Sequence, residues 1–434
     1  MEKAHQVAVI GAGPAGLYGA RKLADSGVNV TLFNRDIKPG GLAEYGIYPA
    51  KITMKNGLRK QFKKILDTPG LHYYGNLSVG EDADLSLDDV RSLGFQAILV
   101  TTGAQGTKWL GLPGEDLEGV YHAKDVVYYY NHLPPFNQKE FRFGSRCLII
   151  GAGNVMIDIA RYLIRQEKVD EVTALVRRGP AEVKFTKKEL EYIAANMDLD
   201  WLDAEIERCA ENMRSVNQDP DAAKAFLLSA LPKAQEKVSD TKFGFRFLCS
   251  PKSMQGDENG LLTHVDVEEN LLALKDGVTK PRSTGEILPI EAETIIFAIG
   301  DKVDENFGLP TEWSEYIKNE SPRFPQDDKT YEVADADDIF VAGWSRKASD
   351  GLVGYARKDG VKGAQAVLSY LEKLPKISSV DGAVEEKLAS LGKPFVTNDA
   401  ALRLYDAETA EAEKRSMDEF KFDENSEMLK VVGL

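Results

Sequence analysis

The stretch Val7-Ala8-Val9-Ile10-Gly11-Ala12-Gly13-Pro14-Ala15-Gly16 decides the fold of the first part of the chain. Its four opening apolar residues predict a buried parallel strand, and its glycines follow with the G-x-G-x-x-G spacing. Residues 17–24 then predict a helix, and the apolar run 28–33 predicts a second strand. The stretch therefore opens a complete βαβ unit, an arrangement typical of dinucleotide binding.

Each glycine of this loop has a distinct expected role. Gly11 permits the tight turn, Gly13 lets the backbone approach a pyrophosphate, and Gly16 allows close packing of helix on strand. Pro14 and Ala15 lie at the start of the helix, whose free N–H groups and positive dipole end favour phosphate. An incidental glycine-rich turn is the alternative, and the strand–turn–helix–strand context favours dinucleotide binding.

The second strand ends in Asn34-Arg35-Asp36, where such a unit usually carries an acidic residue for the adenosine ribose. An amide can also bond ribose hydroxyls, so Asn34 is the expected ribose ligand and Asp36 the alternative. Arg35, the next residue, is included in the expected binding site.

A second unit of the same kind follows. Residues 147–150 predict a strand, residues 151–154 a turn, residues 155–165 a helix and residues 172–176 the next strand. Two such units with different turns indicate two different dinucleotides. The expected contacts of the second nucleotide are Gly151, Gly153, Asn154 and Val155.

The next strand of this second unit ends in Arg177-Arg178-Gly179-Pro180. Guanidinium groups match a 2′-phosphate and cannot accept a hydrogen bond from a 2′-hydroxyl, so Arg177 and Arg178 predict NADP rather than NAD. The alternative is that two arginines merely keep a surface loop soluble.

The composition limits the class of protein. A chain of 434 residues is expected to form two domains. The formal net charge of −15 opposes binding to nucleic acid or anionic membrane, and no stretch approaches the ~18 apolar residues of a membrane span. The first residues show no secretory signal pattern, so we expect a cytoplasmic protein.

Metal chemistry is not expected. Cys147, Cys209 and Cys249 lie far apart without a C-x-x-C pair, and the five histidines show no metal-ligand spacing. Redox chemistry would therefore come from a bound organic cofactor.

With both loops in place, the chain resembles the adrenodoxin reductase family of ferredoxin–NADP reductases, which is related to the flavin subunit of glutamate synthase. The resemblance runs over nearly the whole chain. The motifs that carry it are Gly40-Gly41-Leu42-Ala43-Glu44-Tyr45-Gly46-Ile47, Gly75-Asn76-Leu77-Ser78-Val79-Gly80, Thr102-Gly103-Ala104, Gly151-Ala152-Gly153-Asn154-Val155, Arg177-Arg178-Gly179-Pro180, Phe185-Thr186-x-x-Glu189-Leu190, Ala342-Gly343-Trp344 and Gly351-Leu352-Val353.

The resemblance implies an α/β protein with two Rossmann-like domains, one for FAD and one for NADP. The FAD domain is discontinuous, with residues 1–110 as its first part and 331–434 as its second part and C-terminal tail; residues 111–330 form the NADP domain. Further flavin contacts implied by the family are Gly41, Leu42, Gly46, Val79, Thr102, Gly103, Gly343, Trp344, Gly351, Leu352 and Val353. The implied reaction passes hydride from NADPH to FAD, and then single electrons to a ferredoxin-like carrier protein.

Three residues are expected to act in catalysis: Lys51, Glu189 and Trp344. The family carries a His just after the Pro that matches Pro49, whereas this chain has Lys51, which would lie over the flavin edge as in the glutamate synthase-like branch. A surface lysine, or one that docks an acidic acceptor, is the alternative. Glu189 is implied to lie beside the nicotinamide nucleotide; the alternative is that it only stabilises a helix start.

Two other functions remain open at this point. The chain could be a flavin-bearing NAD(P)H electron-input subunit of a larger complex, similar to the glutamate synthase small subunit, or a nucleotide-binding scaffold without catalysis. The electron acceptor, the direction of electron flow and the oligomeric state are not predicted. Residues after about Pro375 predict a charged tail with a helix over residues 408–421, which would wrap the flavin domain or serve a partner.

Overall fold

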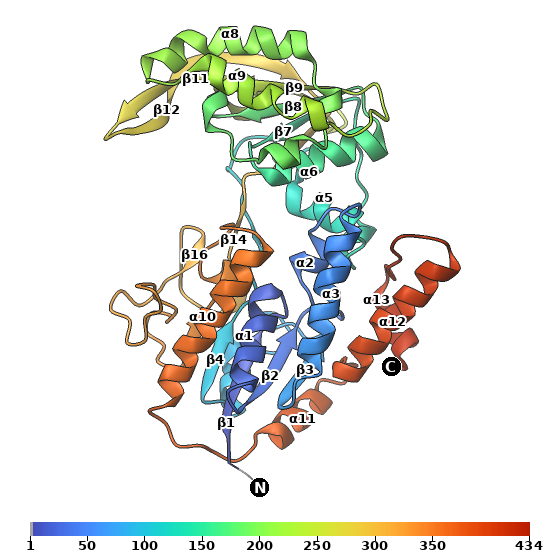
Figure 1. Cartoon of the computed structure of the whole chain (residues 1–434), viewed down its shortest axis with the longest axis vertical. Coiled ribbons are helices and arrows are strands. Elements are labelled where there is room, and N and C mark those ends of the chain that lie inside the picture. Colours follow the sequence, from blue (N-terminus) through green and yellow to red (C-terminus); the bar gives the residue numbers. More distant parts are fainter. Residues whose placement is uncertain (1–2) are drawn as a thin grey trace. The chain divides into compact units, whose positions relative to one another are not determined.

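The computed structural model describes residues 3–434, which form two units (Figure 1). Unit 1 contains the chain up to Thr107, the short segment Tyr128–Gln138 and the region Gly300–Leu434. Unit 2 contains Lys108–Val127 and Lys139–Ile299. Unit 1 is therefore made of three separate stretches of the chain, and unit 2 of two.

Unit 1 is built on a parallel sheet of five strands. In spatial order they are β17 (Ile339–Val341), β4 (Ala97–Val100), β1 (His5–Ile10), β2 (Val28–Asn34) and β3 (Leu71–Gly75). Helix α1 (Pro14–Ala24) connects β1 to β2, so the predicted βαβ unit is present. Figure 1 shows α1 beside α10 (Val353–Leu371), and the two helices are in contact.

The apolar run of β1 is explained by burial on both faces. Val7 and Val9 belong to one core cluster, whereas Ala8 and Ile10 belong to another. Successive side chains of a strand point to opposite faces, so both faces of the sheet are covered, as in other parallel sheets. The remaining helices of unit 1 are α2 (Leu42–Tyr45), α3 (Ile52–Leu66), α4 (Leu87–Ser92), α11 (Asp381–Ser390), α12 (Asn398–Lys414) and α13 (Asn425–Val432).

The chain returns to unit 1 earlier than residue 331. The core cluster that contains Ile98 also contains Val303, Phe307 and Tyr316, so the region from Gly300 onward belongs to unit 1. Two short antiparallel pairs occur here. They are β5 (Gly106–Thr107) with β14 (Asp301–Lys302), and β15 (Thr311–Glu312) with β16 (Glu315–Tyr316).

Unit 2 repeats the parallel design. Its five strands are, in spatial order, β6 (Val120–His122), β13 (Thr294–Phe297), β7 (Arg146–Ile150), β8 (Glu171–Val176) and β9 (Lys242–Phe247). Its helices are α6 (Asn154–Tyr162), α7 (Lys187–Leu190), α8 (Leu199–Ser215) and α9 (Pro220–Leu228), while α5 (Ala123–Tyr130) runs across the boundary of the two units. An antiparallel sheet of β10 (Cys249–Gly256), β11 (Leu262–Lys275) and β12 (Val278–Glu291) completes it, with β11 and β12 as a long ribbon (Figure 1).

The C-terminal region is not a tail. Leu404 of α12 and Met428 of α13 belong to the core cluster of the α1 face, whereas Leu388 of α11 belongs to the cluster on the other face of the sheet. The helix predicted over residues 408–421 is the end of α12, which stops at Lys414, and residues 415–421 are not helical. The sequence predicted a charged tail, but apolar side chains of this region such as Leu404 and Met428 are buried.

The three cysteines are buried and unpaired. Burial raises the pKa of the Cys147 and Cys209 thiols to about 12, so neither is a reactive thiolate near neutral pH. In the part of the chain that the structure describes, no helix is both long and apolar enough to cross a membrane.

The packing of α12 predicts a large effect of Leu404→Ala, because this wholly buried side chain lies in the core of unit 1. We expect the free energy of unfolding to fall by about 2–5 kcal/mol in urea denaturation. Leu434→Ala, at a half-exposed position, serves as the control. Equal stability of the two variants would restore the view that the C-terminal region is a tail.

Candidate functional site

The first glycine loop has the geometry that its sequence predicts. Gly11 has a φ of +103°, and a Cβ there would lie 2.6 Å from the Thr101 carbonyl oxygen. A Cβ on Gly16 would lie 1.8 Å from the Gly11 carbonyl oxygen, so helix α1 approaches the turn more closely than any side chain allows. A Cβ on Gly13 would meet no atom within 4 Å. The open space beside Gly13 fits a group that approaches the backbone, as a pyrophosphate does.

Three other predicted segments meet this loop at the carboxyl ends of β1, β4 and β17. The Gly40 N–H donates to the Ala12 carbonyl at 2.8 Å, and a Cβ on Gly41 would lie 3.1 Å from the Gly13 Cα. A Cβ on Gly343 would lie 2.6 Å from the Ala15 Cβ. In open α/β sheets, ligands bind at this edge of the sheet.

Ser345 joins two of these segments, those of Thr102-Gly103 and Gly343-Trp344. Its Oγ accepts a hydrogen bond from the Gly103 N–H at 2.9 Å and lies 3.2 Å from the Thr102 Oγ1. The Thr102-Gly103 turn and the Gly343-Trp344 turn are therefore held together. The Trp344 indole Nε1 donates to the Asp350 carbonyl at 2.9 Å, which fixes its ring.

Asp359 is a residue of the candidate site that the sequence analysis did not identify. It lies buried in α10 and accepts a hydrogen bond from the Gly343 N–H at 2.7 Å and from the Tyr331 hydroxyl at 2.9 Å. It also pairs with Arg346 at 2.7 Å. Burial alone would lower the pKa of Arg346, but Asp359 holds it above its usual value. The carboxylate thus anchors the turn at Gly343; no local motif marks it, because its partners are distant in sequence.

Asn34 has partners within the chain. Its Oδ1 accepts from the Ala12 N–H at 2.9 Å, and its Nδ2 donates to the Asp36 carbonyl at 2.8 Å. The amide is buried and ties the end of β2 to the glycine loop. Arg35 is partly exposed; it pairs with Asp36 at 2.9 Å and donates to the Gln105 Oε1 at 3.0 Å. The side chains nearer to solvent at this strand end are thus those of Arg35 and Asp36.

The other predicted flavin contacts lie in varied surroundings. Leu42 is partly buried against the cluster of Tyr45, Tyr128 and Leu133. Gly46 is the C-cap of α2, and a Cβ there would lie 2.8 Å from the Leu42 side chain. Val79 packs against the core cluster that contains Ile98 and Val100 of β4.

The remaining predicted residues flank two helix starts. Gly351 has a φ of +74°, Leu352 caps α10 and is 68% exposed, and Val353 packs on the core. Lys51 precedes α3 and is partly exposed. Its role toward a flavin stays a prediction.

The second glycine loop follows β7. Gly151 has a φ of +141°, and a Cβ there would lie 2.5 Å from the Ala298 carbonyl oxygen. A Cβ on Gly153 would meet nothing within 4 Å, as at Gly13 in the first loop. The next residue, Asn154, begins α6 and its Oδ1 accepts from the Thr186 N–H at 3.1 Å; Val155 is exposed.

The Phe185-Thr186-x-x-Glu189 segment is bound to this loop. The N–H groups of Lys184 and Phe185 both donate to the Ala152 carbonyl, at 2.7 and 3.1 Å. Thr186 caps α7, and its Oγ1 accepts from the Glu189 N–H at 3.3 Å. Glu189 therefore lies in the first turn of a helix and also near the loop, so both of its predicted roles remain.

The two predicted NADP arginines differ. Arg178 is partly buried; its guanidinium pairs with Glu182 at 2.7 Å and donates to the Thr279 carbonyl at 2.9 Å. Arg177 is exposed, and among residues 3–434 no ion pair of its guanidinium is found. Arg177 is thus the better candidate for a 2′-phosphate. Within the same described range, no cluster of His, Cys, Asp and Glu is suited to a metal ion.

Comparison with known proteins agrees with this geometry. Residues 5–344 match the family described as pyridine nucleotide-disulphide oxidoreductase. The chain belongs to this family. It is 28% identical over 392 residues to the NADPH-ferredoxin reductase FprA of Mycobacterium leprae, covering 82% of this chain and 81% of that protein. It is 29% identical over 459 residues to the mitochondrial NADPH:adrenodoxin oxidoreductase of Drosophila melanogaster, covering 99% and 94%.

Solved structures confirm the fold. FprA of Mycobacterium tuberculosis, in complex with NADPH, matches with a TM-score of 0.83 at 23% identity and covers 99% of this chain and all of that one. Lactococcus lactis thioredoxin reductase gives a TM-score of 0.52 at 19% identity, over 85% of this chain and all of that one. The predicted fold of two Rossmann-like domains and the predicted resemblance to adrenodoxin reductases are confirmed.

The first glycine loop predicts different results for two neighbouring substitutions. Gly13→Ala should fold normally, because its Cβ meets no protein atom, and yet bind a dinucleotide poorly, because the methyl group enters the ligand's space. Gly16→Ala should fail to fold stably, because its Cβ overlaps the Gly11 carbonyl. Circular dichroism and dinucleotide content report the two effects separately. Loss of folding in Gly13→Ala would contradict the assignment.

The surroundings of Arg177 and Arg178, which follow β8, predict that the two residues contribute differently to the preference for NADPH over NADH. Arg177→Ala should raise the KM for NADPH by about tenfold and leave that for NADH unchanged, since only NADPH loses a charge-assisted bond. Arg178→Ala should have a smaller effect on this selectivity, because Arg178 is already paired with Glu182. Equal effects of Arg177→Ala on both cofactors, in steady-state kinetics, would make this residue part of a solvated loop.

Proposed function

We propose that this protein is an FAD-dependent NADPH–ferredoxin reductase. The observation that carries the proposal is the pair of glycine loops, each with open space at its second glycine. Relatives that align with most of the chain are named NADPH-ferredoxin reductase and NADPH:adrenodoxin oxidoreductase, which supports this pair of cofactors and this acceptor class. When bound, the flavin accepts hydride from NADPH and gives up electrons singly, while the protein supplies binding and orientation.

In this proposal unit 1 holds FAD. The backbone at Gly13 and Gly41 lines the pyrophosphate space, and the start of α1 offers its free N–H groups. The turns at Thr102 and Gly343, held together by Ser345, bound the same sheet edge. Trp344 and Lys51 are the residues we assign to the flavin ring region on the strength of the family resemblance.

Unit 2 holds NADP in the same way. The loop around Gly153 takes the pyrophosphate, Arg177 binds the 2′-phosphate, and Glu189 contacts the nicotinamide nucleotide through its carboxylate. Asn154 fixes the segment that carries Glu189, since its amide oxygen accepts from the Thr186 N–H. Each of these residues positions the cofactor; none needs to exchange a proton with it.

The proposed acceptor is a ferredoxin or a similar one-electron carrier protein. The cellular site that we propose is the cytoplasm, since three unpaired thiols fit a reducing compartment.

The proposed function predicts a yellow protein with one FAD per chain. It should reduce a soluble ferredoxin with NADPH when isolated, measured by the absorbance of a coupled cytochrome. Rates should fall with rising salt if docking depends on local charge, even though the chain is acidic overall. A flavin-free protein that cannot be reconstituted would contradict the proposal. Flavin reduction by NADPH without turnover on any ferredoxin or flavodoxin would instead favour an electron-input subunit of a larger complex.

A further inference from the structure

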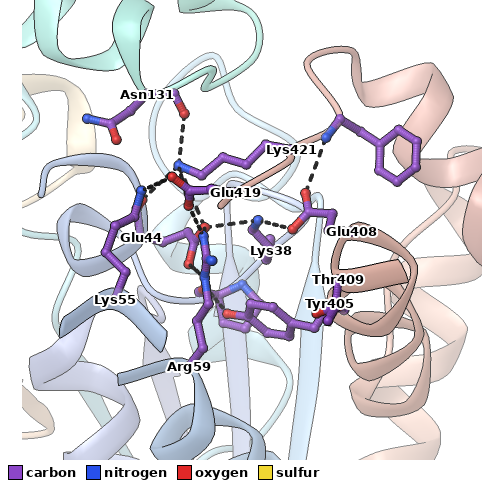
Figure 2. A network of polar contacts seen from close by, with 12 residues as sticks. Lys38, Glu44, Lys55, Arg59, Asn131, Tyr405, Glu408, Thr409, Glu419 and Lys421 are labelled. Atoms are coloured by element: carbon purple, nitrogen blue, oxygen red, sulfur yellow. Dashed lines mark hydrogen bonds and ion pairs between the residues drawn. The ribbon is translucent and has the colours of Figure 1, made fainter. Parts of the chain in front are cut away.

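A group of charged side chains in unit 1 is buried or largely buried (Figure 2). They come from two distant parts of the chain, the region of α2 and α3 and the C-terminal region. The members of this buried charge network are Lys38, Glu44, Lys55, Arg59, Glu408, Glu419 and Lys421.

Glu44, in α2, is the centre of the network. It is wholly buried, accepts from the Arg59 Nε at 2.7 Å and pairs with the Lys38 Nζ at 3.0 Å. Burial would raise the pKa of Glu44, but Lys38, Arg59 and Lys421 hold it well below its usual value. Glu44 is therefore ionised, and removing a cation would leave a buried charge that is poorly compensated.

The C-terminal region supplies the other half of the network. Lys38 is paired with Glu408, and Arg59 with Glu419. The Glu419 Oε2 also accepts from the Lys55 Nζ at 2.8 Å. The C-terminal region thus provides the carboxylates that satisfy cations of the α2–α3 region.

Lys421 links three segments of the chain. Its Nζ donates to the backbone carbonyl of Glu44 at 3.0 Å and to that of Asn131 at 2.9 Å. Figure 2 shows the side chain extending from the C-terminal segment to these two carbonyls. Lys421 therefore holds the backbone of α2 directly.

The segment that Lys421 holds is the one that meets the first glycine loop. Gly40 donates its N–H to the Ala12 carbonyl, and Gly41 lies against the Cα of Gly13. From the C-terminal region, the Tyr405 hydroxyl of α12 donates to the Pro39 carbonyl at 2.7 Å. Residues 39–44 are thus held between the glycine loop and the C-terminal region.

We propose that the segment from Tyr405 to Lys421 is part of the flavin site, with Lys421 and Glu419 as positioning residues. They hold residues 39–44 against the loop at Gly13, and so keep open the space that the pyrophosphate of FAD enters. Neither residue is required to touch the flavin. The inference rests on the proposed function, in which unit 1 binds FAD.

The test is FAD binding to the flavin-free protein, measured by fluorescence titration, with the circular dichroism of the bound flavin as a second readout. Lys421→Met keeps the length of the side chain and removes its hydrogen-bond donors to the Glu44 and Asn131 carbonyls; we expect FAD binding to weaken about tenfold or more and the flavin signal to change. Lys421→Arg, which keeps donors at this position, should restore part of the affinity. Lys387→Met is the matched control, because Lys387 also joins the C-terminal region to the N-terminal part of unit 1, through Asp89 of α4 at 2.6 Å near the surface.

The outcomes separate the inference from the proposed function. Wild-type affinity and spectrum in Lys421→Met, or an equal loss in Lys387→Met, would overturn the positioning role. If Lys421→Met does not fold, Glu419→Gln decides the matter, because it breaks the pairs with Lys55 and Arg59 at a partly exposed position. A wild-type protein that binds no FAD would overturn the proposed function and this inference with it.

Discussion

Unit 1 depends on one close approach of backbone to backbone. The turn after β1 passes so near to β4 and to the start of α1 that neither Gly11 nor Gly16 can carry a side chain. This approach sets the direction of α1 and leaves its first N–H groups at the carboxyl edge of the sheet. The space beside Gly13, the turn at Gly343 and the contact with Gly41 all follow from where this loop lies.

Support for the loop comes from distant parts of the chain. A Cβ on Gly360 would overlap the Ala15 carbonyl, so α10 packs against α1 at its very start. Asp359, the preceding residue, binds the Gly343 N–H and Arg346. On the other side, the buried charge network holds α2. Buried ions are costly unless they are paired, so the network specifies one position for these segments rather than adding much stability.

The sequence predicted both βαβ units to within a few residues, because glycine spacing and runs of apolar residues are local signals. It also predicted which segments converge, through the family resemblance. It placed the return of the chain at residue 331 rather than Gly300, and it predicted one helix in a charged tail where the structure has α11, α12 and α13. Their apolar positions lie between many charges, and a charged composition reads as solvated until the partners of those charges are known.

What the sequence by itself determined is the pair of dinucleotide loops, since the residues that shape each loop are neighbours in the chain. Only the tertiary structure decided which polar side chains are already bonded within the chain and which are left to bind a ligand. Asn34 and Arg178, both predicted as ligands, already bond to Ala12 and Glu182. Lys421 reaches Glu44 across 377 positions of the chain. The physical reason is that burial and pairing depend on residues brought together by folding, and no spacing along the chain records them.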